Sequence, residues 1–178
     1  MQPTREKILD VLFKLIYIHG YNGTSMSMIL KECGIPKGSL YHHFKSKKEM
    51  VLAVIQERLS PNMEEFYELD VQEGDDGIEI LVNALLKVTQ KENLLLYGCP
   101  LNRLNQEMSP IDKDFETAIN SIYEKIKIQI KDVLEYASLE ENIDKDSLAS
   151  FIITTVWGAL SLSPSNSSKE FRMYSSTF

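Results

Sequence analysis

Apolar residues recur at steps of three and four along most of this chain of 178 residues. The pattern holds over residues 8–18, is clearest over residues 112–137, and returns over residues 144–162. Such spacing puts apolar side chains on one face of an α-helix, whereas a half-buried strand needs strict alternation of apolar and polar residues. Because no segment alternates in that way, the sequence predicts an all-α fold, and no internal repeat is found.

Composition and cysteine usage restrict the class of protein. A hydrophobic content of 43% and a charged content of 25% are ordinary for a folded globular chain. Cys33 and Cys99 form no CxxC pair, and no apolar signal segment precedes them, so we expect reduced thiols and a cytoplasmic location. The apolar stretch over residues 151–162 is shorter than the roughly 18 to 20 residues of a membrane span, so no membrane segment is expected.

Cap and turn residues divide the first fifty residues into three short helices. Thr4 is the expected N-cap of the first helix, and Gly20 is placed to end it in the left-handed conformation. Hydroxyl side chains over residues 24–27 offer caps for a second helix, which must stop at Gly34. Pro36 then suits the start of a third helix.

Two short helices joined by a turn that contains glycine predict a helix-turn-helix, whose second helix enters the major groove of DNA. Over residues 37–44, Leu40 and Phe44 share the apolar side of the helix, and the other side is polar. Ser46 is the expected N-cap of the next helix. The two lysines after it put positive charge beside a helix N-terminus, and both features attract phosphate.

The net charge of −7 argues by itself against a polyanionic partner. The charge is unevenly distributed, however. Residues 1–50 carry eight basic and four acidic side chains, a balance of +4, whereas the rest carries 11 basic and 22 acidic side chains, a balance of −11. This asymmetry is typical of a nucleic-acid-binding segment attached to an acidic domain, and double-stranded DNA is therefore the predicted partner.

The segment that carries these features also resembles a known family. Residues 24–26 read Thr-Ser-Met, and residues 33–49 read Cys-Gly-Ile-Pro-Lys-Gly-Ser-Leu-Tyr-His-His-Phe-Lys-Ser-Lys-Lys-Glu. Over about residues 4–58 the chain closely resembles the N-terminal domain of the TetR (tetracycline repressor) family. The resemblance implies a three-helix DNA-binding domain, a long fourth helix, a variable helical domain, homodimerisation and, usually, repression relieved by a small ligand.

Docking geometry and the resemblance together predict the side chains that contact DNA. They are Ser25, Lys37, Gly38, Ser39, Tyr41, His42, His43 and Lys48. Tyr41 or His43 could instead pack on the first helix, and Phe44 is expected in the core. His42 and His43 with Cys33 could suggest a metal site, but adjacent helical positions point apart and no fourth ligand is suitably spaced. No metal and no cofactor is therefore predicted.

The remainder of the chain is predicted to be helical over residues 46–69, 78–91, 101–108, 112–137 and 144–162. Pro61 lies early enough to kink the first of these helices. The helix over residues 144–162 is apolar or small on more than one face, as expected for a helix buried between a domain core and a second copy of the chain. Two domains are predicted, residues 1–46 for DNA binding and residues 47–178 for ligand binding and homodimerisation.

Residues 97–108 are similar to a Gly-Cys-x-x-x-x-Leu-x-x-Glu segment in one branch of TetR regulators, which implies that the region borders a ligand cavity. Ligand cavities are usually apolar with a few polar groups. The similar composition of this region predicts a small-molecule effector of unknown identity. The same side chains at helical spacing are equally how cores are built. The residues expected to line the cavity are Met63, Phe66, Tyr67, Leu85, Cys99, Leu104, Met108, Phe115, Ile119, Tyr123, Phe151, Thr154 and Trp157.

After Leu162 the chain runs through Ser-Pro-Ser-Asn-Ser-Ser, where the family usually has a last dimerisation helix. We expect either a short helix from about residue 168 or a truncated sequence. Two other functions are alternatives to a ligand-released repressor. One is a helical ligand-binding or interaction module without DNA function. The other is an enzyme, which is not predicted because the chain has no Ser/His/Asp order, no phosphate-binding glycine loop and no HExxH motif.

Overall fold

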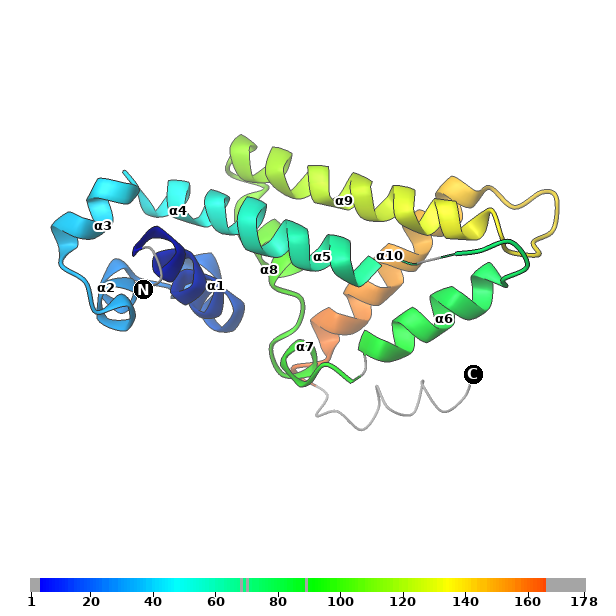
Figure 1. The fold of residues 1–178 in the computed structure, drawn as a ribbon, viewed down its shortest axis with the longest axis horizontal. Helices are drawn as coiled ribbons and strands as arrows, with labels where there is room; N and C mark the ends of the chain where they lie inside the picture. Colours follow the sequence, from blue (N-terminus) through cyan, green and yellow to red (C-terminus); the bar gives the residue numbers. More distant parts are fainter. Residues whose placement is uncertain (1–3, 68, 70, 89, 166–178) are drawn as a thin grey trace. The chain divides into compact units, whose positions relative to one another are not determined.

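The computed structural model describes residues 4–67, 69, 71–88 and 90–165, with side chains for all of these except residues 64–67. This part of the chain is helical and contains no strand, which confirms the all-α prediction (Figure 1). The helices are α1 (Thr4–Gly23), α2 (Met26–Cys33), α3 (Lys37–His43), α4 (Lys47–Val54), the π-helical turn η1 (Ile55–Leu59), α5 (Ser60–Tyr67), α6 (Gly77–Val88), α7 (Glu92–Tyr97), α8 (Pro100–Met108), α9 (Lys113–Leu134) and α10 (Lys145–Leu162).

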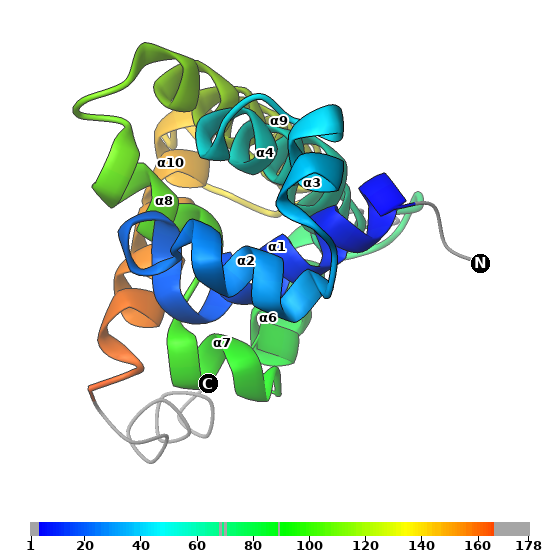
Figure 2. The ribbon, with the colours of Figure 1, turned by 90° about the vertical axis from the view of Figure 1, so that its left-hand side faces the viewer.

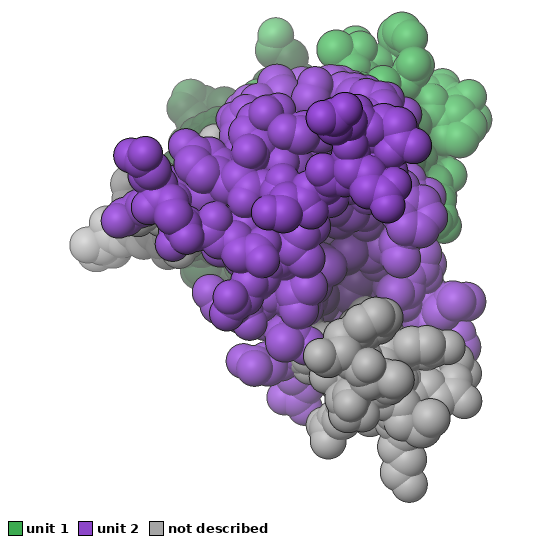
Figure 3. All heavy atoms as spheres, turned by 90° about the vertical axis from the view of Figure 1, so that its right-hand side faces the viewer, with its two compact units in different colours: residues 1–62, 100–120 green, residues 63–99, 121–178 purple. Residues whose placement is uncertain are grey.

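The chain forms two compact units, each built from two separate segments (Figure 3). Unit 1 comprises residues 1–62 and 100–120, and unit 2 comprises residues 63–99 and 121–178. The predicted boundary at residue 46 separates two functions rather than two compact bodies, and it stays a prediction. The segment expected to form a helix from about residue 168 lies outside the described residues.

Helix α1 supplies the first apolar face of unit 1, with Ile8, Leu9 and Leu12 fully buried. Its regular geometry breaks at Gly20, which has φ 72° and ψ −172°, and one further turn follows. Gly20 has a positive φ, but its ψ is not that of the predicted left-handed conformation, and α1 continues to Gly23 instead of ending at Gly20. Thr24 donates a hydrogen bond of 2.7 Å from its hydroxyl to the Gly20 carbonyl, so the break has its own internal partner.

Helices α2 and α3 form the predicted helix-turn-helix (Figure 2). The Ser25 hydroxyl caps α2 by accepting the Met28 N–H at 3.2 Å. Gly34 ends α2 in the left-handed conformation, at φ 60° and ψ 31°, and donates its N–H to the carbonyls of the preceding turn. Pro36 lies immediately before α3, where its missing N–H costs no helical hydrogen bond.

Helices α4 and α5 continue one another through the π-helical turn η1, within the long helix that the sequence predicts. The wider turn is closed by a hydrogen bond from the Ser60 N–H to the Ile55 carbonyl. Pro61 lacks an N–H and cannot pair with the Glu57 carbonyl in the turn before it. The Arg58 guanidinium donates to that carbonyl instead, at 2.9 Å. The irregularity that Pro61 predicts is therefore a π-turn one step upstream.

Charged side chains tie this turn to α1. Arg5 donates two hydrogen bonds to the Glu57 carboxylate, at 2.7 Å and 2.5 Å. Arg58 pairs with both Glu6 and Asp10 at 2.7 Å. Hydrogen bonding from Arg5 lowers the pKa of Glu57 below its ordinary value. These pairs hold α1 beside the helix that starts at α4.

Helix α8 lies far along the chain but packs against α1 within unit 1. Its Leu101 and Leu104 side chains are fully buried. The Arg103 guanidinium donates to the Ile18 carbonyl at 2.8 Å, and the Glu107 carboxylate accepts the Asn22 N–H at 2.8 Å. Residues 100–108 therefore hold the end of α1 on either side of Gly20.

In unit 2, α6 buries one apolar face, and α10 buries Ile153, Trp157 and Leu160. Asp144 caps α10 as predicted, accepting N–H groups of the first turn. Its neighbour Asp146 pairs with two lysines of α9. The sequence predictions missed α7, because its run of three leucines has no helical periodicity. Within the described ranges, no helix is both long and apolar enough to cross a membrane.

Candidate nucleic-acid interface

The polar side of α3 is exposed, as the helix-turn-helix prediction requires. Lys37, Gly38 and His42 are exposed, and Tyr41 is 42% exposed. On the other side, Leu40 and Phe44 are buried in the core of unit 1. The alternative in which Tyr41 or His43 packs on the first helix is not favoured for the exposed Tyr41, and it stays open for the half-buried His43. The Lys37 ammonium lies 5.7 Å from the centre of the Tyr41 ring, so the two side chains form one surface.

The two histidines at the end of α3 lie together. Their ring centroids are 5.3 Å apart and nearly perpendicular, at 74°. Neighbouring helical positions are expected to point apart, but these two rings contact each other edge to face within α3. Cys33 is fully buried, and burial raises the pKa of its thiol. In the part of the chain that the structure describes, no group of three or more His, Cys, Asp or Glu side chains could hold a metal ion.

Ser25, Ser39 and Gly38 occupy different settings in the motif. The exposed Ser25 hydroxyl caps α2 and lies 2.8 Å from the Ser27 hydroxyl, whereas Ser39 is half-buried in α3. Gly38 has open space around it, because a Cβ added there would meet no atom within 4 Å outside the helix backbone. The fold itself therefore does not require a glycine at this position.

The N-terminus of α4 is capped from two directions. The Ser46 hydroxyl accepts the Glu49 N–H at 3.1 Å, as predicted. The Glu49 carboxylate reaches back and accepts the Lys45 N–H at 2.7 Å, an arrangement close to a capping box. Glu49 therefore places a negative charge near the helix end that was expected to attract phosphate.

The two lysines after Ser46 have different partners. Lys47 donates to the Tyr21 carbonyl at 2.5 Å and lies 4.1 Å from the centre of the Tyr21 ring. Desolvation at this site lowers the pKa of Lys47. Lys48 pairs with Asp112 at 2.7 Å and with Asp114 at 2.8 Å, and the hydrogen bonds to these carboxylates raise its pKa. Lys47 is therefore a contact to α1, whereas Lys48 pairs with carboxylates beside the start of α9.

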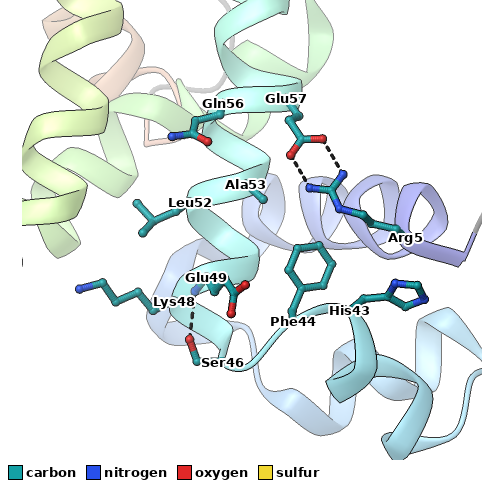
Figure 4. A pocket seen from close by; sticks show the side chains of 10 residues that line it. All are labelled: Arg5, His43, Phe44, Ser46, Lys48, Glu49, Leu52, Ala53, Gln56 and Glu57. Atoms are coloured by element: carbon teal, nitrogen blue, oxygen red, sulfur yellow. Dashed lines mark hydrogen bonds and ion pairs between the residues drawn. The ribbon is translucent and has the colours of Figure 1, made fainter.

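An open hollow of about 520 Å³ lies beside this helix end in unit 1 (Figure 4). The Arg5 guanidinium lies 5.3 Å over the Phe44 ring and forms its double hydrogen bond with Glu57 at one side of the hollow. Figure 4 shows the Lys48 side chain pointing away from that pair. The lining residues are Arg5, His43, Phe44, Ser46, Lys48, Glu49, Leu52, Ala53, Gln56 and Glu57. Both signs of charge are present, so the hollow is not selective for an anion or a cation.

Four residues predicted to line a ligand cavity belong to the core of unit 1. They are buried and lie on α8 and the first half of α9: Leu104, Met108, Phe115 and Ile119. The Phe115 ring contacts the Tyr21 ring edge to face, with centroids 5.3 Å apart. At least Phe115 therefore has a packing role that requires no ligand.

Other predicted cavity residues lie in unit 2. Tyr123 packs against Trp157 with ring centroids 4.1 Å apart. Burial, and to a smaller extent the charge of the nearby Cys99, raise the pKa of the Tyr123 hydroxyl. Phe151 is 67% exposed and Thr154 is also exposed, because α10 turns a different face toward the core. Met63 and Leu85 are half-buried. The structure does not describe the side chains of Phe66 and Tyr67.

The geometry of unit 1 defines a class of protein. An exposed helix of seven residues follows a capped helix that packs on α1 and a glycine turn, which is the architecture of a helix-turn-helix transcriptional regulator. Comparison with known proteins gives the family. Residues 8–54 match the family of bacterial regulatory proteins described as "tetR family".

Full-length similarity extends this result to the rest of the chain. An uncharacterized HTH-type transcriptional regulator of Lactococcus lactis subsp. lactis is 31% identical over 91% of this chain and 84% of its own length. The transcriptional repressor DhaR of Mycobacterium sp. is 26% identical over 89% of this chain and 81% of its own. The reduced form of Escherichia coli NemR superposes with a TM-score of 0.80 at 22% identity, covering 98% and 95% of the two chains.

The chain therefore belongs to the TetR family, whose members are transcriptional regulators and not enzymes.

Proposed function

We propose that the protein is a cytoplasmic, homodimeric repressor that binds a palindromic operator and leaves it when a small molecule binds. The observation that carries the proposal is the exposed side of α3, where Lys37 lies beside Tyr41, His42 is exposed and Gly38 leaves open space. Side chains of this kind donate hydrogen bonds to phosphates and to base edges in the major groove.

The remaining predicted contacts, on either side of α3, are placed to hold the phosphate backbone of the DNA. Ser25 is exposed at the N-terminus of α2, and Lys48 lies in the first turn of the helix that follows α3. Phosphate contacts from such positions fix the orientation of a recognition helix without reading sequence. The similarity to DhaR, which is described as a repressor, supports repression rather than activation.

An exposed stripe on α10 supports the homodimer. Phe151 and Leu162 are 67% and 64% exposed, and Thr155 and Gly158 lie between them at steps of three and four residues. Exposed apolar side chains at helical spacing are typical of a surface that another helix covers. A second copy of α10 is the proposed partner, since small residues in the middle of the stripe allow two helices to approach closely.

The ligand part of the proposal depends on unit 2. Its aromatic pair, the half-buried Tyr123 and the buried Trp157, combines two apolar rings with one hydroxyl and one indole N–H. Ligand sites commonly combine apolar walls with a few such polar groups. We therefore expect a small, largely apolar effector.

The test is selection of genomic fragments by the full-length protein, followed by sequencing of the retained DNA and by elution with a metabolite pool. We expect an inverted repeat whose half-sites lie about one DNA turn, roughly 34 Å, apart. Retained sites without two-fold symmetry would contradict the dimeric operator complex, and retention that no metabolite changes would contradict ligand release. If no DNA were retained at low salt, the alternative of a helical interaction module would replace the proposal.

A further inference from the structure

The ammonium of Lys48 is enclosed by two carboxylates from the start of α9. Its Nζ lies 2.7 Å from one Asp112 oxygen, 2.9 Å from the other, and 2.8 Å from Asp114. All three residues belong to unit 1, so the contact is internal to the compact body that carries α3. In this structure the lysine proposed to bind a DNA phosphate is already paired with carboxylates of its own chain.

The local structure keeps the Asp112 carboxylate in place without help from Lys48. Asp112 precedes α9 and accepts the Asp114 N–H at 3.0 Å, as an N-cap does. Its side chain is only 20% exposed, whereas that of Asp114 is 67% exposed. Carboxylate oxygens bind an ammonium in the way that phosphate oxygens do, through charge-assisted hydrogen bonds. The start of α9 therefore presents Lys48 with a group that resembles its proposed ligand.

We propose that Asp112 and Asp114 compete with DNA phosphate for Lys48, as an autoinhibitory contact built into unit 1. DNA binds at the N-terminus of α4 only when the lysine leaves these carboxylates or shares itself with a phosphate. The inference rests on the proposed function, because it needs DNA at α4.

The contact has the strength that a reversible competitor needs. Lys48 is 38% exposed and Asp114 more so, and exposed ion pairs change an equilibrium by a factor of about two to five. The carboxylates therefore weaken DNA binding without abolishing it.

The experiment compares D114N and D112N with E116Q in the full-length protein. Asparagine at residue 112 keeps the cap of α9 while it removes the charge. Glu116 lies in the same first turn of α9 but pairs with Lys113 at 2.8 Å, so E116Q removes an equal charge without touching Lys48. The probe is a fluorescently labelled duplex of random sequence at low salt, because a phosphate contact needs no particular sequence.

We expect D114N and D112N each to bind the duplex about two- to fivefold more tightly than E116Q. In a K48A background this difference should vanish, because the lysine for which the carboxylates compete is gone. Equal affinities of D114N and E116Q, or a difference that survives in K48A, would show that the carboxylates act only through long-range charge and would overturn the inference. Weaker binding by D114N would also overturn it, since the carboxylates would then orient the lysine for DNA.

These outcomes are separate from failure of the proposed function. If the wild-type chain and all variants ignored duplex DNA at low salt, both the function and the competition would be excluded. If the wild type bound DNA and the variants behaved alike, only the competition would be excluded. D114N alone suffices for the test if D112N melts at a lower temperature than the wild type.

Discussion

Two positions in unit 1 are occupied by glycine for different reasons. A Cβ on Gly20 would overlap the Glu107 carboxylate, and the backbone there has a positive φ, so the fold needs this glycine. Gly38 has an ordinary helical position and no neighbour near an added Cβ. A glycine in a helix costs about 1 kcal/mol relative to alanine, and nothing inside the molecule offsets that cost at Gly38.

We predict that Gly38→Ala separates stability from function. The free energy of unfolding should stay the same or rise by up to about 1 kcal/mol. Affinity for duplex DNA should fall about tenfold, equivalent to about 1.4 kcal/mol, since the methyl group would lie between α3 and the DNA backbone. Urea denaturation and fluorescence anisotropy measure the two quantities.

Gly34→Ala is the matched control, because Gly34 has φ 60° and open space around it. This variant should lose stability by about 1 kcal/mol through backbone strain, and any loss of DNA binding should follow that loss of stability. Unchanged DNA affinity in Gly38→Ala would contradict the placement of Gly38 at the interface.

At the residue scale, the sequence predicts side chains whose setting is local. The exposure of Lys37 and His42 follows from the cap at one end of α3 and the apolar pair Leu40 and Phe44 on its other side. The partners of Lys48 have no such local signal. Asp112 lies 64 residues away along the chain, and only tertiary packing of α8 and α9 brings it to α4.

At the scale of elements, the pair between Arg5 and Glu57 is a link between α1 and the π-turn. The Arg5 guanidinium lowers the pKa of Glu57 in the folded chain below its value in the unfolded chain. A depressed folded pKa contributes stability above the unfolded pKa, near 4.3, and that contribution is lost as the pH falls through the folded pKa.

We therefore predict that Glu57→Gln lowers the free energy of unfolding at pH 7 by up to about 1 kcal/mol, the range for an exposed ion pair. The difference from the wild type should shrink as the pH falls and vanish once Glu57 is protonated. Urea denaturation of both proteins across acidic pH checks this. A difference that is the same at every pH would mean that the carboxylate charge has no part in the link.

The elements themselves were predictable where a cap and a periodic face coincide. Helices α2, α3, α4 and α10 begin at the serine, proline and aspartate residues that the sequence indicates. Helix α7 has neither a side-chain cap nor a periodic face, and the π-turn depends on how Arg58 replaces the hydrogen bond that Pro61 cannot donate. Such replacements depend on tertiary contacts as well as on local sequence.

At the scale of the whole molecule, the exposed stripe of α10 should decide the oligomeric state. We predict that Leu162→Glu converts a dimer into a monomer in sedimentation velocity, because it puts a charge into an interface that otherwise buries apolar surface. Operator affinity should fall as the dimer is lost, since a single chain binds only one half-site.

Ile111→Glu is the control for that change. Ile111 is 76% exposed in the turn before α9, so the same charge is added to an even more exposed apolar residue away from the stripe. This variant should sediment as the wild type does. A Leu162→Glu protein that remains dimeric would exclude α10 as the proposed interface.

The hydrogen bonds of Arg103 and Glu107 to the end of α1 also determine how such regulators can be recombined. The body that carries the recognition helix is built from two stretches of chain, residues 1–62 and 100–120, with other residues between them. A chimera joined at a single point after α4 would pair one parent's Gly20 with another parent's α8. Exchange of DNA specificity between relatives therefore requires both stretches to be transplanted together, or the recognition helix alone to be grafted onto an intact body.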